Sequence, residues 1–240
     1  MCILPGQRGR SSILPTPRAI PQLAEAINRY TLIDAKVDEP LGLHSPALLK
    51  APFVYIAADR GFALAEHEKR NLEKYLRQGG FVFAEDVQVK LDRFHTDGRL
   101  VNRTLRMESG PAKTSLRKMF KDVLGKDARF RILPNSHPIY HSFFDFSSGP
   151  PRARLIPSLN RPLEHDEQYD PPDPWPELEG IYLDGRLVAI YSDLGYGLVW
   201  EDEFQNEPHL KLGVNLVVYA LTQEGSITQQ QIEALMQDDQ

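Results

Sequence analysis

Cysteine is almost absent from this chain, since its 240 residues include one, Cys2. One cysteine cannot form a disulfide within the chain, a cysteine-based zinc cluster or a CxxC redox site. No apolar run approaches the roughly 20 residues of a membrane helix, and residues 1–15 lack the apolar core of a secretory signal. We therefore expect a cytoplasmic protein as the sequence stands, or a periplasmic or cell-envelope protein if a leader has been removed.

An excess of positive charge is also missing. The formal net charge is −5, and basic residues are scattered except between Arg93 and Arg106. These features give no electrostatic reason to expect nucleic acid as the main partner. The sequence has no Walker A loop and no Gly-x-Ser-x-Gly elbow, and Gly195-x-Gly197 is too short for a dinucleotide loop. We therefore predict no cofactor.

The most informative stretch that is present covers residues 51–87. Two continuous apolar runs, Phe53–Ala58 and Phe81–Ala84, match strands that are covered on both faces. The residues between them place Leu72, Tyr75 and Leu76 on one face of an amphipathic helix, and Gly79-Gly80 ends it. This pattern predicts a strand–helix–strand crossover, and hence an α/β fold with a mostly parallel sheet.

The rest of the chain fits one domain. We expect an irregular segment at residues 1–20 and a single α/β domain at residues 21–240, with a proline-rich loop at about residues 145–180. Asp184-Gly185 between two apolar runs predicts a β-hairpin. Further predicted elements are a helix from Pro21, a strand at Thr31–Val37, a helix at Ser115–Leu124, a strand at Phe130–Leu133, and helices at His209–Leu221 and Ser226–Met236.

Several segments, taken in order, resemble the DUF4159 family, a bacterial family of unknown function. They are Ala51–Ile56, Leu76–Asp86, Ser136–Tyr140, Leu178–Ile181 with Gly185–Tyr191, and Lys211–Leu221. The resemblance implies a flavodoxin-like, class I glutamine amidotransferase-like three-layer sandwich, and the glycine pair and the His-Pro-Ile step are also similar to ThuA-like relatives linked to sugar utilisation. It further implies a genomic setting near MoxR-type ATPases and von Willebrand factor A proteins, and so protein partners.

A glutamine amidotransferase needs a cysteine on a strained elbow between a strand and a helix. Here the predicted strand ends on Glu85-Asp86 instead, and Cys2 lies far away in the sequence. We therefore reject a cysteine-dependent amidotransferase. The two carboxylates are the leading candidates for a site, as metal ligands or as acid and base. The alternative is that one of them caps the next segment or pairs with an arginine of residues 93–106.

His137 and Asp193 are the other catalytic candidates. Pro138 holds the backbone of His137 extended, which could bring its ring to the same crevice, or the ring could bond the backbone and fix the turn. Asp193 follows an apolar strand and could join Glu85 and Asp86, or form a turn. No metal site is predicted, because His141 and the loop at 165–167 offer ligand types without ligand spacing.

Ligand-binding candidates lie nearby in the predicted fold. Asp59 and Arg60 follow the first apolar strand, where open α/β sheets bind ligands. Tyr196 and Trp200 could stack on a sugar or peptide, or Trp200 could fill the core.

These residues leave three functions open. The first is a non-catalytic binding or scaffolding domain, which we prefer. The second is a metal-assisted hydrolase or sugar-acting enzyme, which requires the four catalytic candidates to converge. The third is a homo-oligomeric structural role, which would show as an exposed apolar patch.

Overall fold

The computed structural model describes residues 2–3, 16–37, 40–87, 89–91, 95–96, 99–100, 105–107, 111–151, 177–201 and 206–238. Most of the predicted proline-rich loop, residues 152–176, lies outside this part of the chain, and so do the candidate ligand types at residues 165–167. The side chains between residues 88 and 112 lie outside it too, so the predicted pairing of a carboxylate with an arginine of this stretch concerns residues that are not described.

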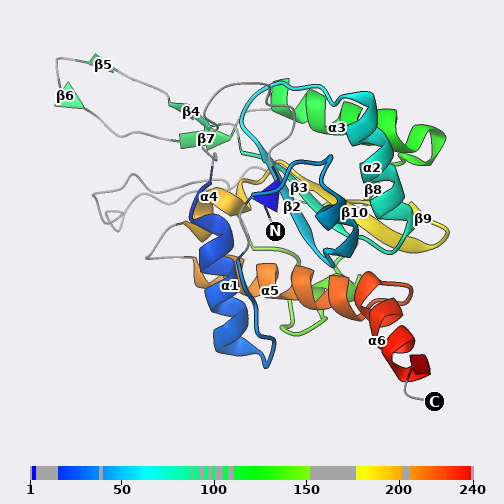
Figure 1. Cartoon of the computed structure of the whole chain (residues 1–240). Helices are drawn as coiled ribbons and strands as arrows, with labels where there is room; N and C mark the ends of the chain where they lie inside the picture. Colours follow the sequence, from blue (N-terminus) through cyan, green and yellow to red (C-terminus); the bar gives the residue numbers. More distant parts are fainter. Residues whose placement is uncertain are drawn as a thin grey trace.

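A six-stranded sheet forms the centre of the described fold (Figure 1). The first four strands in spatial order are parallel, and the last two are antiparallel to their neighbours. In that order the strands are β1 (Cys2–Ile3), β2 (Val54–Ala58), β3 (Val82–Asp86), β10 (Arg186–Ser192), β9 (Glu179–Leu183) and β8 (Arg131–Ile132). The strand β3 therefore lies between β2 and β10, with its carboxyl end at the same edge as theirs.

The fold class is α/β, as predicted. The sheet differs from the mostly parallel sheet that the sequence predicts, because β9 and β8 run antiparallel to their neighbours and make it mixed. The predicted crossover is confirmed, because β2 and β3 are parallel and α2 (Glu66–Arg77) joins them. The departure comes from Asp184-Gly185, which forms the predicted two-residue turn with φ of 49° and 85°. A turn this short can join only antiparallel strands, so β9 must run against β10.

Helices cover both faces of the sheet (Figure 1). On one face lie α2 and α3 (Pro111–Leu124), which pack on alternate side chains of β2 such as Val54 and Ile56. On the other face lie α1 (Ala19–Tyr30), α4 (Tyr196–Trp200) and α5 (Glu207–Thr222), which pack on Tyr55 and Ala57. Because successive side chains of a strand point to opposite faces, the continuous apolar runs supply both cores at once.

Short elements complete the described part of the chain. The 3-10 helices are η1 (Pro46–Lys50), η2 (Gly125–Asp127) and η3 (Pro138–Tyr140). Two small hairpins, drawn away from the main sheet in Figure 1, pair β4 (Val89–Leu91) with β7 (Leu105–Met107) and β5 (His95–Thr96) with β6 (Arg99–Leu100). The last helix is α6 (Ile227–Asp238).

Two predictions near the N-terminus differ from the structure. The predicted irregular segment contains β1, which pairs with β2, and α1 begins at Ala19, two residues before Pro21. The predicted strand at Thr31–Val37 is wrong, since this segment has no strand pairing. Its path is held instead by Asn28, whose side chain bonds the backbone N–H and C=O of Ala35.

The helix α5 is anchored by one buried polar side chain. The Asn215 amide donates to the carbonyls of Ile139 and Phe144 at 3.1 and 2.8 Å, and its oxygen accepts from the Phe144 N–H at 2.8 Å. These bonds fix the segment after η3 onto the helix, and they satisfy backbone groups that burial would otherwise leave unpaired. Among the described helices, α5 included, none is both long enough and apolar enough to cross a membrane.

Candidate functional site

The carboxyl end of β3 is the centre of the candidate site, and it is closed to solvent. Glu85 and Asp86 are the last two residues of the strand, with exposed fractions of 0% and 1%. Consecutive strand residues face opposite sides of a sheet. Glu85 accordingly contacts Tyr55 and α4, whereas Asp86 lies on the face that α3 covers. The two carboxylates therefore do not share one environment.

Four hydrogen bonds from this chain surround the Glu85 carboxylate. Oε1 accepts from the Tyr196 N–H at 2.5 Å and from the Ser192 hydroxyl at 3.3 Å. Oε2 accepts from the Gly197 N–H at 2.7 Å and from the Tyr55 hydroxyl at 3.0 Å. Each oxygen thus accepts two bonds, which uses the usual capacity of a carboxylate. The arrangement holds Glu85 in place and offers a ligand no free oxygen lone pair.

Two of these donors are the first backbone N–H groups of α4. Gly195 precedes the helix in a left-handed conformation, with φ of 74°. The N–H groups at a helix start have no partner within the helix, so an acceptor is needed there. Glu85, which precedes Tyr196 by 111 residues and Gly197 by 112, supplies that acceptor and caps α4. Glu85 is therefore a helix cap, as the alternative interpretation has it. The segment that it caps is α4 and not the next segment along the chain.

Gly197 belongs to the Gly195-x-Gly197 pattern, to which the sequence analysis gave no function, and the structure shows why a glycine stands here. A Cβ on this residue would lie 2.0 Å from the Tyr55 hydroxyl oxygen and 3.2 Å from Oε2 of Glu85. No side chain fits at that spacing, so glycine is required for the backbone to approach the carboxylate. Sequence reasoning missed Tyr55, Ser192 and Gly197 as partners of Glu85. The available signal was a tyrosine in an otherwise apolar strand beside the strand that ends in Glu-Asp.

Burial also sets the protonation of Glu85. Removal from water raises the pKa of its carboxyl from 4.5 to about 7, and the bonds from Gly197, Tyr196, Tyr55 and Ser192 oppose the rise. A carboxyl with this pKa could exchange a proton near neutral pH, as a general acid or base does. Here four donors of the protein already bond its two oxygens, so a reacting group would have to displace one of them.

The other face of this edge carries paired charges. Lys113 of α3 lies 2.7 Å from Asp193, and both side chains are about one-third exposed. Arg117 of α3 pairs with Glu179 of β9, and its guanidinium lies 4.0 Å from the ring centroid of Phe130. Burial raises the pKa of the nearby Tyr191 hydroxyl, and the charges of Asp193 and Asp86 raise it further. Asp193 is thus balanced by a cation rather than directed at Glu85.

His137 lies at the opposite edge of the sheet. Its Nδ1 accepts the Ile139 N–H at 3.1 Å, and its Nε2 lies 3.0 Å from the Tyr182 hydroxyl. Tyr182 is opposite Leu187 in β10, whereas Glu85 is opposite Ser192. Five residues of strand separate these levels, or about 16 Å. Burial lowers the pKa of His137, which favours the neutral ring that fixes the turn.

The predicted ligand-binding residues are not grouped either. Asp59 and Arg60 form an exposed pair with each other, with Nε and Oδ1 3.1 Å apart. Tyr196 and Trp200 are fully buried, and their polar atoms donate to the backbone carbonyls of Pro151 and His209. A ring inside the core cannot stack on a sugar or peptide, so the structure places Trp200 where the alternative interpretation put it.

The described residues contain no group of three or more histidine, cysteine, aspartate or glutamate side chains that could hold a metal ion. His141 is bound within its own loop, where Nδ1 lies 2.5 Å from Asp145 and Nε2 lies 2.9 Å from the Asn135 carbonyl. The four catalytic candidates thus do not share one site: Glu85 caps a helix, His137 fixes a turn at the other edge, and Asp86 and Asp193 both lie on the face that α3 covers, where the charges of both act on Tyr191.

Comparison with known proteins agrees with the resemblance seen in the sequence. The model of a family described as a domain of unknown function, DUF4159, matches residues 9–221. That range includes the whole main sheet except β1 and ends within the last turn of α5. The search among curated proteins gave no match for the chain.

Proposed function

We propose that this chain, which belongs to the DUF4159 family of unknown function, is a non-catalytic binding or scaffolding domain. We further propose that its architecture is the flavodoxin-like, glutamine amidotransferase-like sandwich without the nucleophilic cysteine. The parallel strands β2, β3 and β10, with helices on both faces, support this relationship.

One observation carries the proposal. The carboxylate at the end of the central strand is fully buried, and each of its oxygens already accepts two hydrogen bonds from the protein itself. A catalytic group must reach its substrate, directly or through one water. Glu85 instead stabilises the start of α4, and it occupies the strand end at which a cysteine-dependent amidotransferase of the proposed fold would need its nucleophile. The single cysteine, Cys2, lies in β1 beside β2 and not at the end of β3.

The separation of the candidates weighs against the alternative, a metal-assisted hydrolase or a sugar-acting enzyme. That function needs Glu85, Asp86, Asp193 and His137 to act on one substrate. Glu85 and Asp86 face opposite sides of the sheet, and His137 lies at the other edge. Asp193 is held by Lys113.

The exposed face of α6 is the surface that we propose for contact with another protein chain. Ile232, Leu235 and Met236 have exposed fractions of 52%, 67% and 66%. Their spacing of three and four residues places them on one side of the helix, where apolar residues normally pack against something. We propose a second copy of this chain as the partner, with the MoxR-type and von Willebrand factor A proteins implied by the family resemblance as the other candidates.

Thermal unfolding in the presence of ligands tests the non-catalytic function. The wild type, Asp86→Asn and Asp193→Asn are each heated with divalent metal ions, monosaccharides and nucleotides. Glu25→Gln, at an exposed position of α1, is the charge-matched control. A ligand at 100 times its Kd would add about 2.7 kcal/mol to the free energy of unfolding. We expect no stabilisation that depends on either aspartate. A metal or sugar that stabilises the wild type and the control but neither aspartate variant would overturn the proposal.

A further inference from the structure

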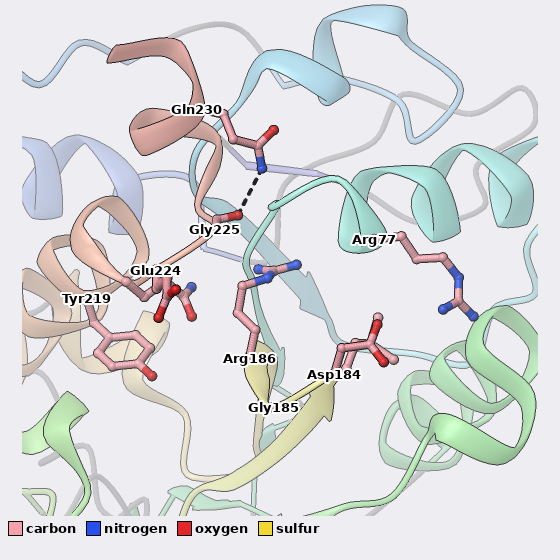
Figure 2. A pocket seen from close by; sticks show the side chains of 10 residues that line it. Arg77, Asp184, Gly185, Arg186, Tyr219, Glu224, Gly225 and Gln230 are labelled. Carbon is pink, nitrogen blue, oxygen red and sulfur yellow. Dashed lines mark hydrogen bonds between the residues drawn. The ribbon is translucent and has the colours of Figure 1, made fainter. Parts of the chain in front are cut away.

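A polar pocket lies at the sheet edge opposite Glu85 (Figure 2). It has a volume of about 680 Å³, within the usual range for small-molecule sites. The turn between β9 and β10, the end of α2 and the junction of α5 with α6 enclose it. The side chains that matter here are Arg77, Asp184, Arg186, Tyr219, Gln223 and Glu224.

The amide of Gln223 is the first sign of a ligand. Both its oxygen and its nitrogen are buried, and neither has a hydrogen-bond partner among the described residues. A buried amide without partners is costly, and native proteins rarely keep one without a reason. Gln223 is one of the residues that line the pocket, and a rotation of its side chain towards the pocket would let its two N–H groups donate to an oxyanion there. A bound molecule would thus satisfy a group that the protein leaves unsatisfied.

Arg186 is the second sign. It is more than half-buried, and it donates to the carbonyls of Leu76 and Gly80, the latter at 3.0 Å. A guanidinium has five N–H donors, so three remain after these two bonds. No carboxylate of the described chain lies within ion-pair distance of Arg186, whereas Arg77 is paired with Glu73 and Asp127. Within the described chain, Arg186 therefore presents a half-buried positive charge without a carboxylate counter-ion.

The rim of the pocket carries the opposite charge. Asp184 and Glu224 are exposed, and neither lies within ion-pair distance of a basic group in the described part of the chain. Figure 2 shows Arg186 among the labelled residues with Glu224 on one side and Asp184 on the other. A polyphosphate would be repelled by these two carboxylates. A molecule with one carboxylate and one ammonium group would satisfy both the interior and the rim.

We propose that this pocket binds a small zwitterion of the amino-acid or short-peptide class. Its carboxylate lies against the Arg186 guanidinium and the Gln223 amide, and its ammonium group faces Glu224 and Asp184. The inference goes beyond the proposed function, because it concerns a different edge of the sheet and does not depend on the role of Glu85.

Calorimetric titration with trialanine tests the site. Trialanine carries both charges, its C-terminal amide lacks the carboxylate, and N-acetyl-trialanine lacks the ammonium group. We expect trialanine to bind at least about tenfold more tightly than either derivative, since each loses a charge-assisted hydrogen bond. Equal affinity for trialanine and its amide, or no saturable binding of trialanine, would overturn the proposal and leave the account of Glu85 unchanged.

Variants assign the binding to this pocket. Gln223→Leu keeps the approximate size of the side chain and removes an amide that has no partner in the protein, so it should fold normally. We expect it to weaken trialanine binding at least about tenfold. The matched control, Gln231→Leu, makes the same change on α6 outside the pocket and should bind like the wild type. Wild-type affinity in Gln223→Leu, or an equal loss in the control, would contradict the site.

Discussion

At the scale of single residues, Glu85 combines complete burial with complete hydrogen bonding. Burial favours the protonated carboxyl, while two N–H groups and two hydroxyls favour the carboxylate. The pKa of about 7 reflects the larger effect of burial. Folded protein therefore keeps this proton up to about pH 7, whereas an unfolded chain releases it near pH 4.5. Between these values the folded state binds more protons, so its stability falls as the pH rises.

The first prediction concerns this pH dependence. The shift from 4.5 to about 7 corresponds to about 3 kcal/mol of unfolding free energy lost across the window. Glu85→Gln cannot titrate and should lack this loss. We expect urea unfolding to show a larger advantage of wild type over Glu85→Gln at pH 5 than at pH 8. An equal advantage at the two pH values, or a larger one at pH 8, would mean that the pKa of this carboxyl is not raised in the folded protein.

At the scale of elements, α4 exists because groups from β2, β3 and β10 meet its N-terminus. A helix of five residues is too short to be stable by itself. The bonds to Glu85 and the burial of Tyr196, Val199 and Trp200 supply what the helix lacks. The close approach of its backbone to Tyr55 is possible because residue 197 is glycine.

The second prediction concerns Gly197. The Cβ of Gly197→Ala would overlap the Tyr55 hydroxyl, and overpacking of this kind costs about 1–3 kcal/mol of unfolding free energy. Gly185→Ala is the contrast, since its Cβ meets nothing within 4 Å and only its φ of 85° is unfavourable. In urea unfolding, Tyr55→Phe should recover part of the loss in Gly197→Ala and none of the loss in Gly185→Ala. Additive effects of Tyr55→Phe and Gly197→Ala would show that the two side chains do not interact.

At the scale of the whole molecule, the two sheet edges differ in what they offer. At the edge with Glu85, the polar side chains already form hydrogen bonds and ion pairs with other groups of the protein. The opposite edge has a pocket in which the Gln223 amide and the Arg186 charge have no partner and no counter-ion among the residues that the structure describes. Beyond this edge, α6 carries apolar side chains that nothing in the described chain covers. Ligand binding and assembly would therefore both involve the region around the junction of α5 and α6.

The third prediction tests assembly. If a second copy covers the exposed stripe of α6, light scattering should show a mass that rises with protein concentration. Leu235→Glu places a charge in the stripe and should shift the protein towards the monomer. Gln237→Glu adds the same charge on the other side of α6, outside the stripe, and should behave like the wild type. A monomer at all concentrations would exclude self-association and leave a different protein as the partner.

The sequence by itself determined the local structure where the pattern was strong. Continuous apolar runs predicted the buried strands, the helical pattern at 115–124 predicted α3, and Asp184-Gly185 predicted the hairpin, because each rests on neighbouring residues alone. The missing cysteine likewise excluded a known mechanism without any coordinates.

Tertiary structure alone decided what the candidate residues contact. Glu85 and Gly197 are 112 positions apart, and no local pattern shows that a strand end caps a distant helix. Nor does sequence show that His137 and Glu85 lie at opposite edges, since strand order and register set that separation. The same holds for Gln223, whose buried amide has no hydrogen-bond partner among the described residues. Contacts between distant segments depend on how the whole chain packs, and the chemistry of this protein rests on such contacts.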